Sequence, residues 1–143
     1  MTSPAIHASP DDVERAFYQA LAAGDAEKIS QLWAEDEEIV CVHPTGIRLT
    51  DLAPIRNSWR GILANTRLRV QVRVVTQWRG SMLAIHHLNE TLFVGKEQNP
   101  QSTLYVTHVY TRGPHGWRLA CRHASAVDNK RQTLVDAQPH TFH

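Results

Sequence analysis

The sequence predicts an α+β protein in which a cone-shaped, curved antiparallel sheet wraps around three helices of the N-terminal half. Two patterns predict this class. Apolar residues recur at helical spacing in the first half of the chain, whereas the second half alternates apolar and polar residues as strands do. Residues 101–126 then read as two strands joined by Arg-Gly-Pro-His-Gly, a sequence typical of turns. A chain of 143 residues is long enough for one domain with a single core.

Three helices are expected in the first half. Ser9 and Pro10 favour the start of the first helix, because serine can cap free amides and proline suits the first turn. Gly24 favours the end of that helix, and Asp25 can cap the second. A third helix begins at Asp51. The apolar residues of helices and strands are expected to form one core with these members: Phe17, Leu21, Leu32, Trp33, Val72, Val74 and Leu119.

A short strand at 39–42 and long strands at 68–79, 82–95 and on both arms of 101–126 are expected. The strand at 82–95 is apolar on both faces, so the sequence leaves open whether His86 or His87 points inward. Strict alternation on the last arm places Arg122 on one face. The other face is then a pocket wall with polar groups at one end, formed by Trp117, Leu119, Cys121, His123 and Ser125.

Residues 1–10 are expected to be a flexible leader, 11–126 the folded domain and 127–143 a polar tail. The formal net charge of +1 argues against a nucleic-acid-binding protein, which usually has a dense basic face. The sequence has no secretory signal pattern and no apolar run near the roughly 20 residues that span a bilayer. We therefore expect a cytoplasmic protein without membrane or nucleic-acid partners, in which Cys41 and Cys121 are free thiols.

His43 is the first candidate for chemistry. Pro44 restricts His43 to an extended conformation at a strand end, where a neutral imidazole can accept a proton near pH 7. The alternative is that His43 caps the following loop. Tyr105 can donate a hydrogen bond to a developing oxyanion, or it packs on the sheet with its hydroxyl satisfied.

Trp33 and Trp59 can line a cavity, although such residues more often belong to the core. His123 and Ser125 can contact a ligand, and their spacing suits a structural hydrogen bond equally well. The histidines at 43, 87, 108 and 123 have no recognised metal-ligand spacing, and the sequence has no glycine-rich phosphate loop. We therefore expect neither a metal ion nor a cofactor.

Three segments resemble one known superfamily: 17–33 with Gly24-Asp25, the strand end at 41–46, and 116–125. They are similar to the nuclear transport factor 2-like proteins, and most of all to the SnoaL-like and ketosteroid-isomerase-like bacterial members. The resemblance extends over about residues 11–126. It implies a cone-shaped barrel with a deep pocket and a homodimer formed through the sheet.

The resemblance also implies site residues. His43 stands where ketosteroid isomerases have their aspartate base, and Tyr105 stands at the position of the acid that holds the oxyanion. Phe17 matches the tyrosine of the first helix but has no hydroxyl, so it is a candidate for ligand contact. Two functions follow. One is an isomerase, lyase or hydrolase that moves a proton on a small apolar or aromatic carbonyl compound, and the other is a non-catalytic ligand-binding or dimerisation module.

Overall fold

The helices begin and end close to where the sequence predicts. The Ser9 hydroxyl accepts a hydrogen bond from the amide of Asp12 at 3.1 Å, which caps the first helix. Gly24 ends it in the left-handed conformation, with φ of 69°, and the Asp25 carboxylate caps the next helix through the amide of Lys28. The helices are α1 (Pro10–Ala23), α2 (Ala26–Gln31) and α3 (Leu52–Asn65).

Six strands form one sheet in this computed structural model, which describes residues 5–35 and 38–127. The strand order is β2-β1-β6-β5-β4-β3, with β1 parallel to β6 and all other pairs antiparallel. The two-residue strand β2 is the one element that the sequence did not predict. The strands are β1 (Val40–Val42), β2 (Arg48–Leu49), β3 (Leu68–Arg79), β4 (Leu83–Val94), β5 (Ser102–Gly113) and β6 (Gly116–Ala126).

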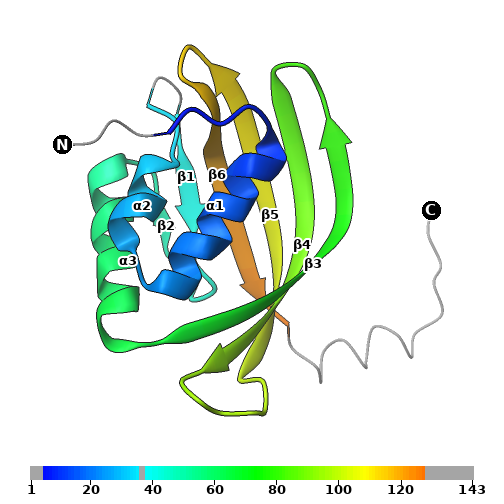
Figure 1. Ribbon diagram of the computed structural model, residues 1–143. Helices are drawn as coiled ribbons and strands as arrows, with labels where there is room; N and C mark the ends of the chain where they lie inside the picture. The colour runs from blue at the N-terminus through cyan, green and yellow to red at the C-terminus, as the bar shows by residue number, and fades with distance from the viewer. Residues whose placement is uncertain (1–4, 36–37, 128–143) are drawn as a thin grey trace.

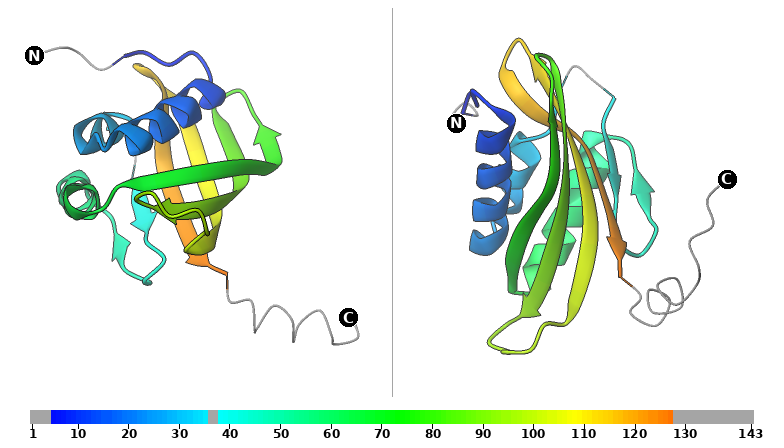
Figure 2. Two further views of the ribbon diagram at one scale, coloured as in Figure 1. Left: turned by 60° about the horizontal axis from the view of Figure 1, so that its bottom comes forward. Right: turned by 90° about the vertical axis from the view of Figure 1, so that its right-hand side faces the viewer.

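The three helices lie on one side of the sheet, the side toward which the long strands curl (Figures 1 and 2). The predicted α+β class and curved sheet are therefore confirmed. No described helix covers the opposite, outer face of β3, β4 and β5. The sheet thus has a concave face packed on helices and an outer face without a helix among the described residues.

The core lies between the helices and the concave face, and most of its predicted members are buried there. Those members are Phe17, Leu21, Leu32, Trp33 and Leu119. Val72 and Val74 are the exceptions, since they are 36% and 47% exposed. They lie opposite Glu90 and Leu88 on the concave side, but β3 is the last strand of the sheet. The prediction that both valines are buried was wrong because alternation identifies a face and not how far the helices cover it.

The chain segment before α1 runs beside the turn between β5 and β6. His7 forms a bridge to Gly116, and its carbonyl accepts a hydrogen bond from the amide of Trp117 at 3.0 Å. Of the expected leader, residues 1–4 lie outside the described residues, as does the expected tail from 128 onward. Cys41 and Cys121 are free thiols, and burial raises the pKa of Cys41 to about 11.

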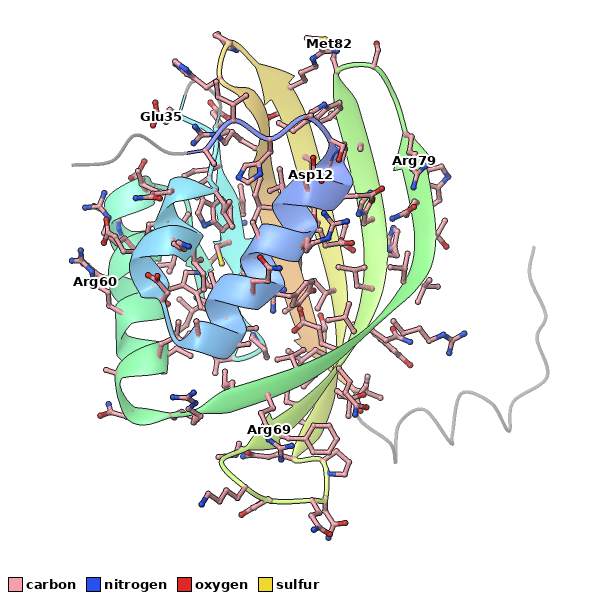
Figure 3. All side chains as sticks on the ribbon, in the orientation of Figure 1. Asp12, Glu35, Arg60, Arg69, Arg79 and Met82 are labelled. Atoms are coloured by element: carbon pink, nitrogen blue, oxygen red, sulfur yellow. The ribbon has the colours of Figure 1, made fainter. Side chains whose placement is uncertain are left out.

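Charged side chains mostly project from the body of the protein, as Figure 3 shows for Glu35, Arg60 and Arg69. Such placement is the norm, because an unpaired charge is costly to bury. Exceptions among the described residues are buried: Glu90, Arg118, Arg122 and the three histidines His43, His86 and His108. Among the described helices, none has both the length and the apolar character that a membrane span needs.

Candidate functional site

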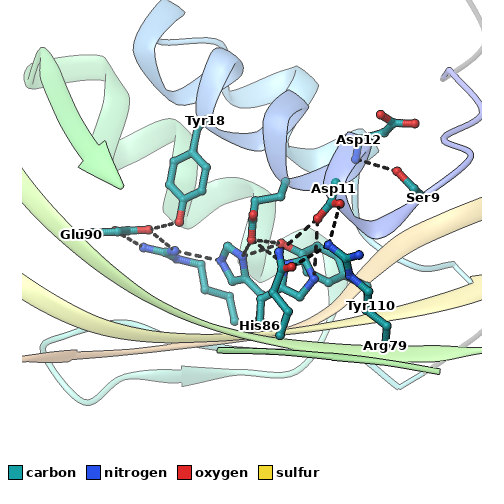
Figure 4. Close-up of polar contacts among 12 residues, drawn as sticks. Ser9, Asp11, Asp12, Tyr18, Arg79, His86, Glu90 and Tyr110 are labelled. Atoms are coloured by element: carbon teal, nitrogen blue, oxygen red, sulfur yellow. Dashed lines mark hydrogen bonds and ion pairs between the residues drawn. The ribbon is translucent and has the colours of Figure 1, made fainter. Parts of the chain in front are cut away.

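A chain of hydrogen-bonded polar side chains crosses the concave side of the sheet beneath α1 (Figure 4). Polar groups removed from water are tolerated when each finds a partner, so this chain of contacts explains how the interior accepts them. Its members come from four elements: Asp11, Glu14 and Tyr18 of α1, His86 and Glu90 of β4, His108 and Tyr110 of β5, and Arg122 of β6.

Arg122 and Glu90 form the centre of this network. The guanidinium donates to both carboxylate oxygens, from Nη1 to Oε2 at 2.7 Å and from Nη2 to Oε1 at 2.9 Å. The Tyr18 hydroxyl also donates to Glu90 Oε2, at 2.6 Å. Burial opposes ionisation of Glu90, but the charge of Arg122 and these hydrogen bonds outweigh it, so the pKa of Glu90 lies below its usual value. The pair is therefore ionised inside the core.

His108 continues the network as a neutral imidazole. Arg122 Nη1 donates to His108 Nε2 at 3.0 Å, and because arginine has only donors, the ring proton must lie on Nδ1. That nitrogen is 2.8 Å from the hydroxyl of Tyr110, which in turn donates to Glu14 Oε1 at 3.0 Å. Burial, followed by the charges of Arg122 and His86, holds the pKa of His108 well below its ordinary value.

Arg122 points inward because β6 contains one extra residue. Cys121 pairs with Val109 whereas Leu119 pairs with Tyr110, which leaves Ala120 as a bulge. Leu119, before the bulge, and Arg122, after it, therefore both face the interior. A single extra residue reverses every later side chain, because side chains along a strand alternate with a period of two.

The bulge corrects the predicted faces of β6. The sequence placed His123 and Ser125 on the inner wall and Arg122 opposite, but Arg122 is buried and the other two are exposed. His123 and Ser125 lie beside Thr107 and Tyr105 of β5 on the outer face. These residues line an open hollow of about 590 Å³ on that face.

His43 lies at the end of β1 and faces inward. Its Nε2 is 2.7 Å from Ser58 Oγ of α3, and its ring packs edge-on against Trp59 with centroids 5.3 Å apart. Burial, then the positive charge of Arg122, lowers the pKa of His43, so the imidazole is neutral at pH 7. Tyr105, by contrast, is 47% exposed on the outer face. The hypothesis that His43 and Tyr105 share one ligand is therefore not supported, because the two side chains lie on opposite sides of the sheet.

The three aromatic candidates lie in the interior with His43. Phe17 and Trp59 pack edge-to-face with centroids 5.7 Å apart, and the guanidinium of Arg122 lies 5.1 Å and 5.6 Å from their ring centres. Trp33 is buried in the same core, and its indole N–H has no acceptor among the described residues. These side chains pack between helices and sheet, and none of the three lines the hollow on the outer face.

Sequence reasoning missed three residues at the centre of the network, namely Tyr18, Glu90 and Arg122. By the resemblance, Phe17 matches the first-helix tyrosine of ketosteroid isomerases and lacks its hydroxyl. The adjacent Tyr18 places a hydroxyl in the interior instead. Glu90 and Arg122 each have apolar residues two positions away on both sides, and they have opposite charges. That combination is the signal that could have indicated a buried ion pair.

A helical layer on the concave side of a strongly curved sheet, with polar side chains in the interior, defines the class of nuclear transport factor 2-like or cystatin-like α+β proteins. A model of the SnoaL-like domain matches residues 11–129, and the chain belongs to this family. None of the curated proteins matches the chain at a significant level.

Two solved structures illustrate what this chain is similar to. One is named as a candidate calcium/calmodulin-dependent protein kinase type II association domain from Thiobacillus denitrificans, with 31% identity and a TM-score of 0.80 over 86% of this chain and 98% of that one. The other is named as a candidate dehydratase of the nuclear transport factor 2-like family from Streptomyces avermitilis, with 28% identity and a TM-score of 0.73 over 81% and 91%.

Proposed function

We propose that this chain is a non-catalytic association module that forms a homodimer through the outer face of its sheet. The observation that carries the proposal is the exposure of large apolar side chains on that face. Val75, Trp78 and Tyr105 are 52%, 53% and 47% exposed. Apolar groups of this size gain free energy when a partner removes them from water, so a cluster of them is typical of an interaction surface.

The charge of the outer face favours a second copy as the partner. None of the described residues that line its hollow is an aspartate, glutamate, lysine or arginine. In a twofold dimer the same patch meets itself, so any net charge on it would repel the identical charge of the partner. A hollow lined by residues without a carboxylate, ammonium or guanidinium group avoids that repulsion. The likeness to a candidate association domain at 31% identity supports the same function.

The filled interior also supports the association module. An enzyme of this fold class needs space for a substrate between helices and sheet. Here the Arg122–Glu90 pair, the Tyr18 hydroxyl and the edge-to-face aromatic rings lie in that region. Most polar groups of the network therefore bond to one another and not to a ligand.

Sedimentation equilibrium at micromolar concentration tests the dimer. The wild-type chain is expected to sediment at twice the monomer mass of 16.2 kDa. Tyr105→Lys should sediment as a monomer, because it places two like charges in the centre of the interface. Ile47→Lys is the matched control, since Ile47 is an exposed apolar residue outside the outer face and should leave the dimer intact. A monomeric wild type, or a Tyr105→Lys variant that still dimerises, contradicts the proposal.

A second candidate function is proton transfer on a small apolar or aromatic carbonyl compound with His43 as the base. The favouring observation is that His43 faces inward with a lowered pKa, so that it is unprotonated at pH 7. The likeness to a candidate dehydratase at 28% identity points in the same direction. The Ser58 hydroxyl, at 2.7 Å, would have to release Nε2 before a substrate could use it.

Deuterium exchange tests this second function without a known substrate. A panel of ketones and aldehydes is incubated with the chain in D₂O, and NMR follows exchange at the carbon next to the carbonyl. A base at His43 predicts exchange that falls about 10²–10⁴-fold in His43→Ala. Ser58→Ala is the matched control and should retain or accelerate exchange, because it frees Nε2. Exchange that is absent in the wild type, or equal in His43→Ala, removes this function.

A further inference from the structure

Three side chains that commonly bind metal ions converge at the end of the interior network, beside the first turn of α1 (Figure 4). They are Asp11 and Glu14 of α1 and His86 of β4, and one ligand atom from each lies within 4.8 Å of the others. Asp11 is partly exposed, Glu14 is mostly buried and His86 is fully buried. The cluster therefore reaches from the interior to the surface.

The protonation of His86 follows from its contacts. Its Nδ1 lies 2.9 Å from Glu14 Oε1, an oxygen that also accepts a hydrogen bond from Tyr110. Because this oxygen acts as an acceptor, Nδ1 of His86 must donate. The other ring nitrogen, Nε2, is buried, has no hydrogen-bond partner among the described residues, and faces Asp11 Oδ1 at 3.9 Å.

A buried ring nitrogen without a partner is unusual, since buried polar atoms are nearly always satisfied. An imidazole that donates from one nitrogen to a carboxylate, and whose other nitrogen is unpaired and faces a second carboxylate, has the arrangement of a metal-ligating histidine. In that arrangement Glu14 would fix the ring orientation and the tautomer of His86. Tyr110 would in turn fix Glu14.

We propose that Asp11 and His86, supported by Glu14, bind a divalent transition-metal ion such as Zn²⁺. Zn²⁺ holds nitrogen and oxygen ligands at about 2.0–2.2 Å, which places two tetrahedral ligands about 3.3 Å apart. The observed separation of 3.9 Å between His86 Nε2 and Asp11 Oδ1 requires a small rotation of the Asp11 side chain, which is 44% exposed. Water completes the coordination on the open side.

The charges around the cluster favour a cation. Asp11 and Glu14 contribute two carboxylates, and the nearby cation is Arg79, which contacts Asp11 Oδ2 at 3.2 Å. Arg79 thus contacts Oδ2 of Asp11 and leaves Oδ1 as the proposed metal ligand. Its side chain is also 64% exposed, and an exposed ion pair contributes little free energy. The amide of Gln77, which donates to Asp11 Oδ1 at 3.2 Å, has to turn away when the ion binds.

The ligand types select the ion. Imidazole nitrogen suits Zn²⁺, Co²⁺, Ni²⁺ and Cu²⁺, whereas Mg²⁺ and Ca²⁺ prefer all-oxygen sites. No local sequence pattern marks this cluster, because 72 residues separate Glu14 from His86. The expectation of no metal considered four other histidines, at 43, 87, 108 and 123, and not His86.

Isothermal titration of the full chain with ZnCl₂ in a non-chelating buffer tests the site. Asp11→Asn removes the charged ligand at an exposed position and should weaken the affinity for zinc at least about tenfold. Asp12→Asn is the matched control, because Asp12 lies in the same helical turn but pairs with Arg15 and is not part of the cluster. The control should bind zinc within about twofold of the wild type. The chain has nine histidines in total, and the comparison with the control also subtracts weaker zinc binding by those other than His86.

Thermal unfolding gives the second readout, since an ion that binds the folded chain raises the melting temperature. Zinc should raise it in the wild type and in Asp12→Asn, and much less in Asp11→Asn and His86→Gln. MgCl₂ and CaCl₂ should have no such effect. The proposal is overturned if Asp11→Asn binds zinc as tightly as Asp12→Asn, if the wild type shows no saturable zinc binding, or if Ca²⁺ binds as well as Zn²⁺.

Discussion

Arg122 and Glu90 are two opposite charges buried together, and each depends on the other. Replacing Arg122 by methionine leaves the Glu90 carboxylate in the interior without its counter-ion. The loss of one partner of a buried pair typically costs about 3–5 kcal/mol of unfolding free energy. Urea unfolding of Arg122→Met against the wild type measures this cost.

The double variant Arg122→Met/Glu90→Leu is the control for that measurement. It removes both charges and should regain most of the lost stability, because apolar residues of similar volume replace a buried pair at little cost. If the double variant is no more stable than Arg122→Met, the loss comes from packing and not from an unpaired charge.

Acid should weaken the same pair. The pKa of Glu90 is lower in the folded chain than the 4.5 of a free carboxyl, so its ionised form contributes stability at pH values above 4.5. That contribution is lost as the pH falls below 4.5 and through the folded pKa. The stability difference between the wild type and Glu90→Gln should therefore shrink on acidification below pH 4.5. Urea midpoints measured across this pH range test it, and a constant difference contradicts it.

His108 should remain neutral under mildly acidic conditions. Its pKa is held well below the ordinary 6.5 by burial and by the charges of Arg122 and His86. Because the unfolded chain takes up this proton first, the contribution of His108 to stability is present above pH 6.5 and is lost as the pH falls toward the folded pKa. Long-range ¹H–¹⁵N NMR should show the Nδ1–H tautomer at about pH 5.5, and an imidazolium signal there would be the contrary result.

At the scale of single elements, the termini of the helices were predictable because their signals are local. Ser9, Pro10 and Gly24 act through contacts within a few residues, and each does what its position in the sequence indicates. The faces of β6 were not predictable in the same way. Ala120 is an extra residue only in relation to β5, and no local pattern marks a bulge that depends on a strand elsewhere in the chain.

The candidate site shows the same limit. The sequence left open whether His43 faces the interior or caps the following loop, and it assigned Arg122 to the wrong face of β6. The choice between His86 and His87 also needed the sheet, which buries His86 and exposes His87 to the outer hollow. Residues far apart in sequence build the network, so its composition could be read only once the register was known.

Two glycines in helical segments should respond oppositely to alanine. Gly24 has a positive φ of 69°, so Gly24→Ala forces a side chain into the left-handed region and should cost about 1 kcal/mol of unfolding free energy. Gly61 lies inside α3, and an added Cβ there meets nothing within 4 Å. Gly61→Ala should stabilise the chain by about 0.5–1 kcal/mol. Chemical unfolding of both variants tests the pair, and equal signs would contradict the assigned end of α1.

At the scale of the whole molecule, the two faces of the sheet have different tasks. On the concave face, polar side chains hydrogen-bond to one another and helices cover the sheet. This face therefore contributes to the stability of the monomer. The outer face keeps exposed apolar residues that no described helix covers. The proposed homodimer would remove this surface from water, and folding and association would then be thermodynamically linked.

This linkage makes the melting temperature depend on protein concentration. The wild-type melting temperature should rise as the protein concentration increases from about 1 to 100 μM. Mass action favours the dimer at higher concentration, and only folded chains form the dimer. Tyr105→Lys should show a lower melting temperature that is constant across the same range, since the added lysine opposes itself across the twofold axis. Ile47→Lys changes an exposed apolar residue away from that face and should keep the slope of the wild type. Calorimetric scans of the three chains at each concentration measure these slopes. A wild-type melting temperature that does not change with concentration would show that the outer face contributes nothing through self-association, whatever the exposure of Val75 and Trp78.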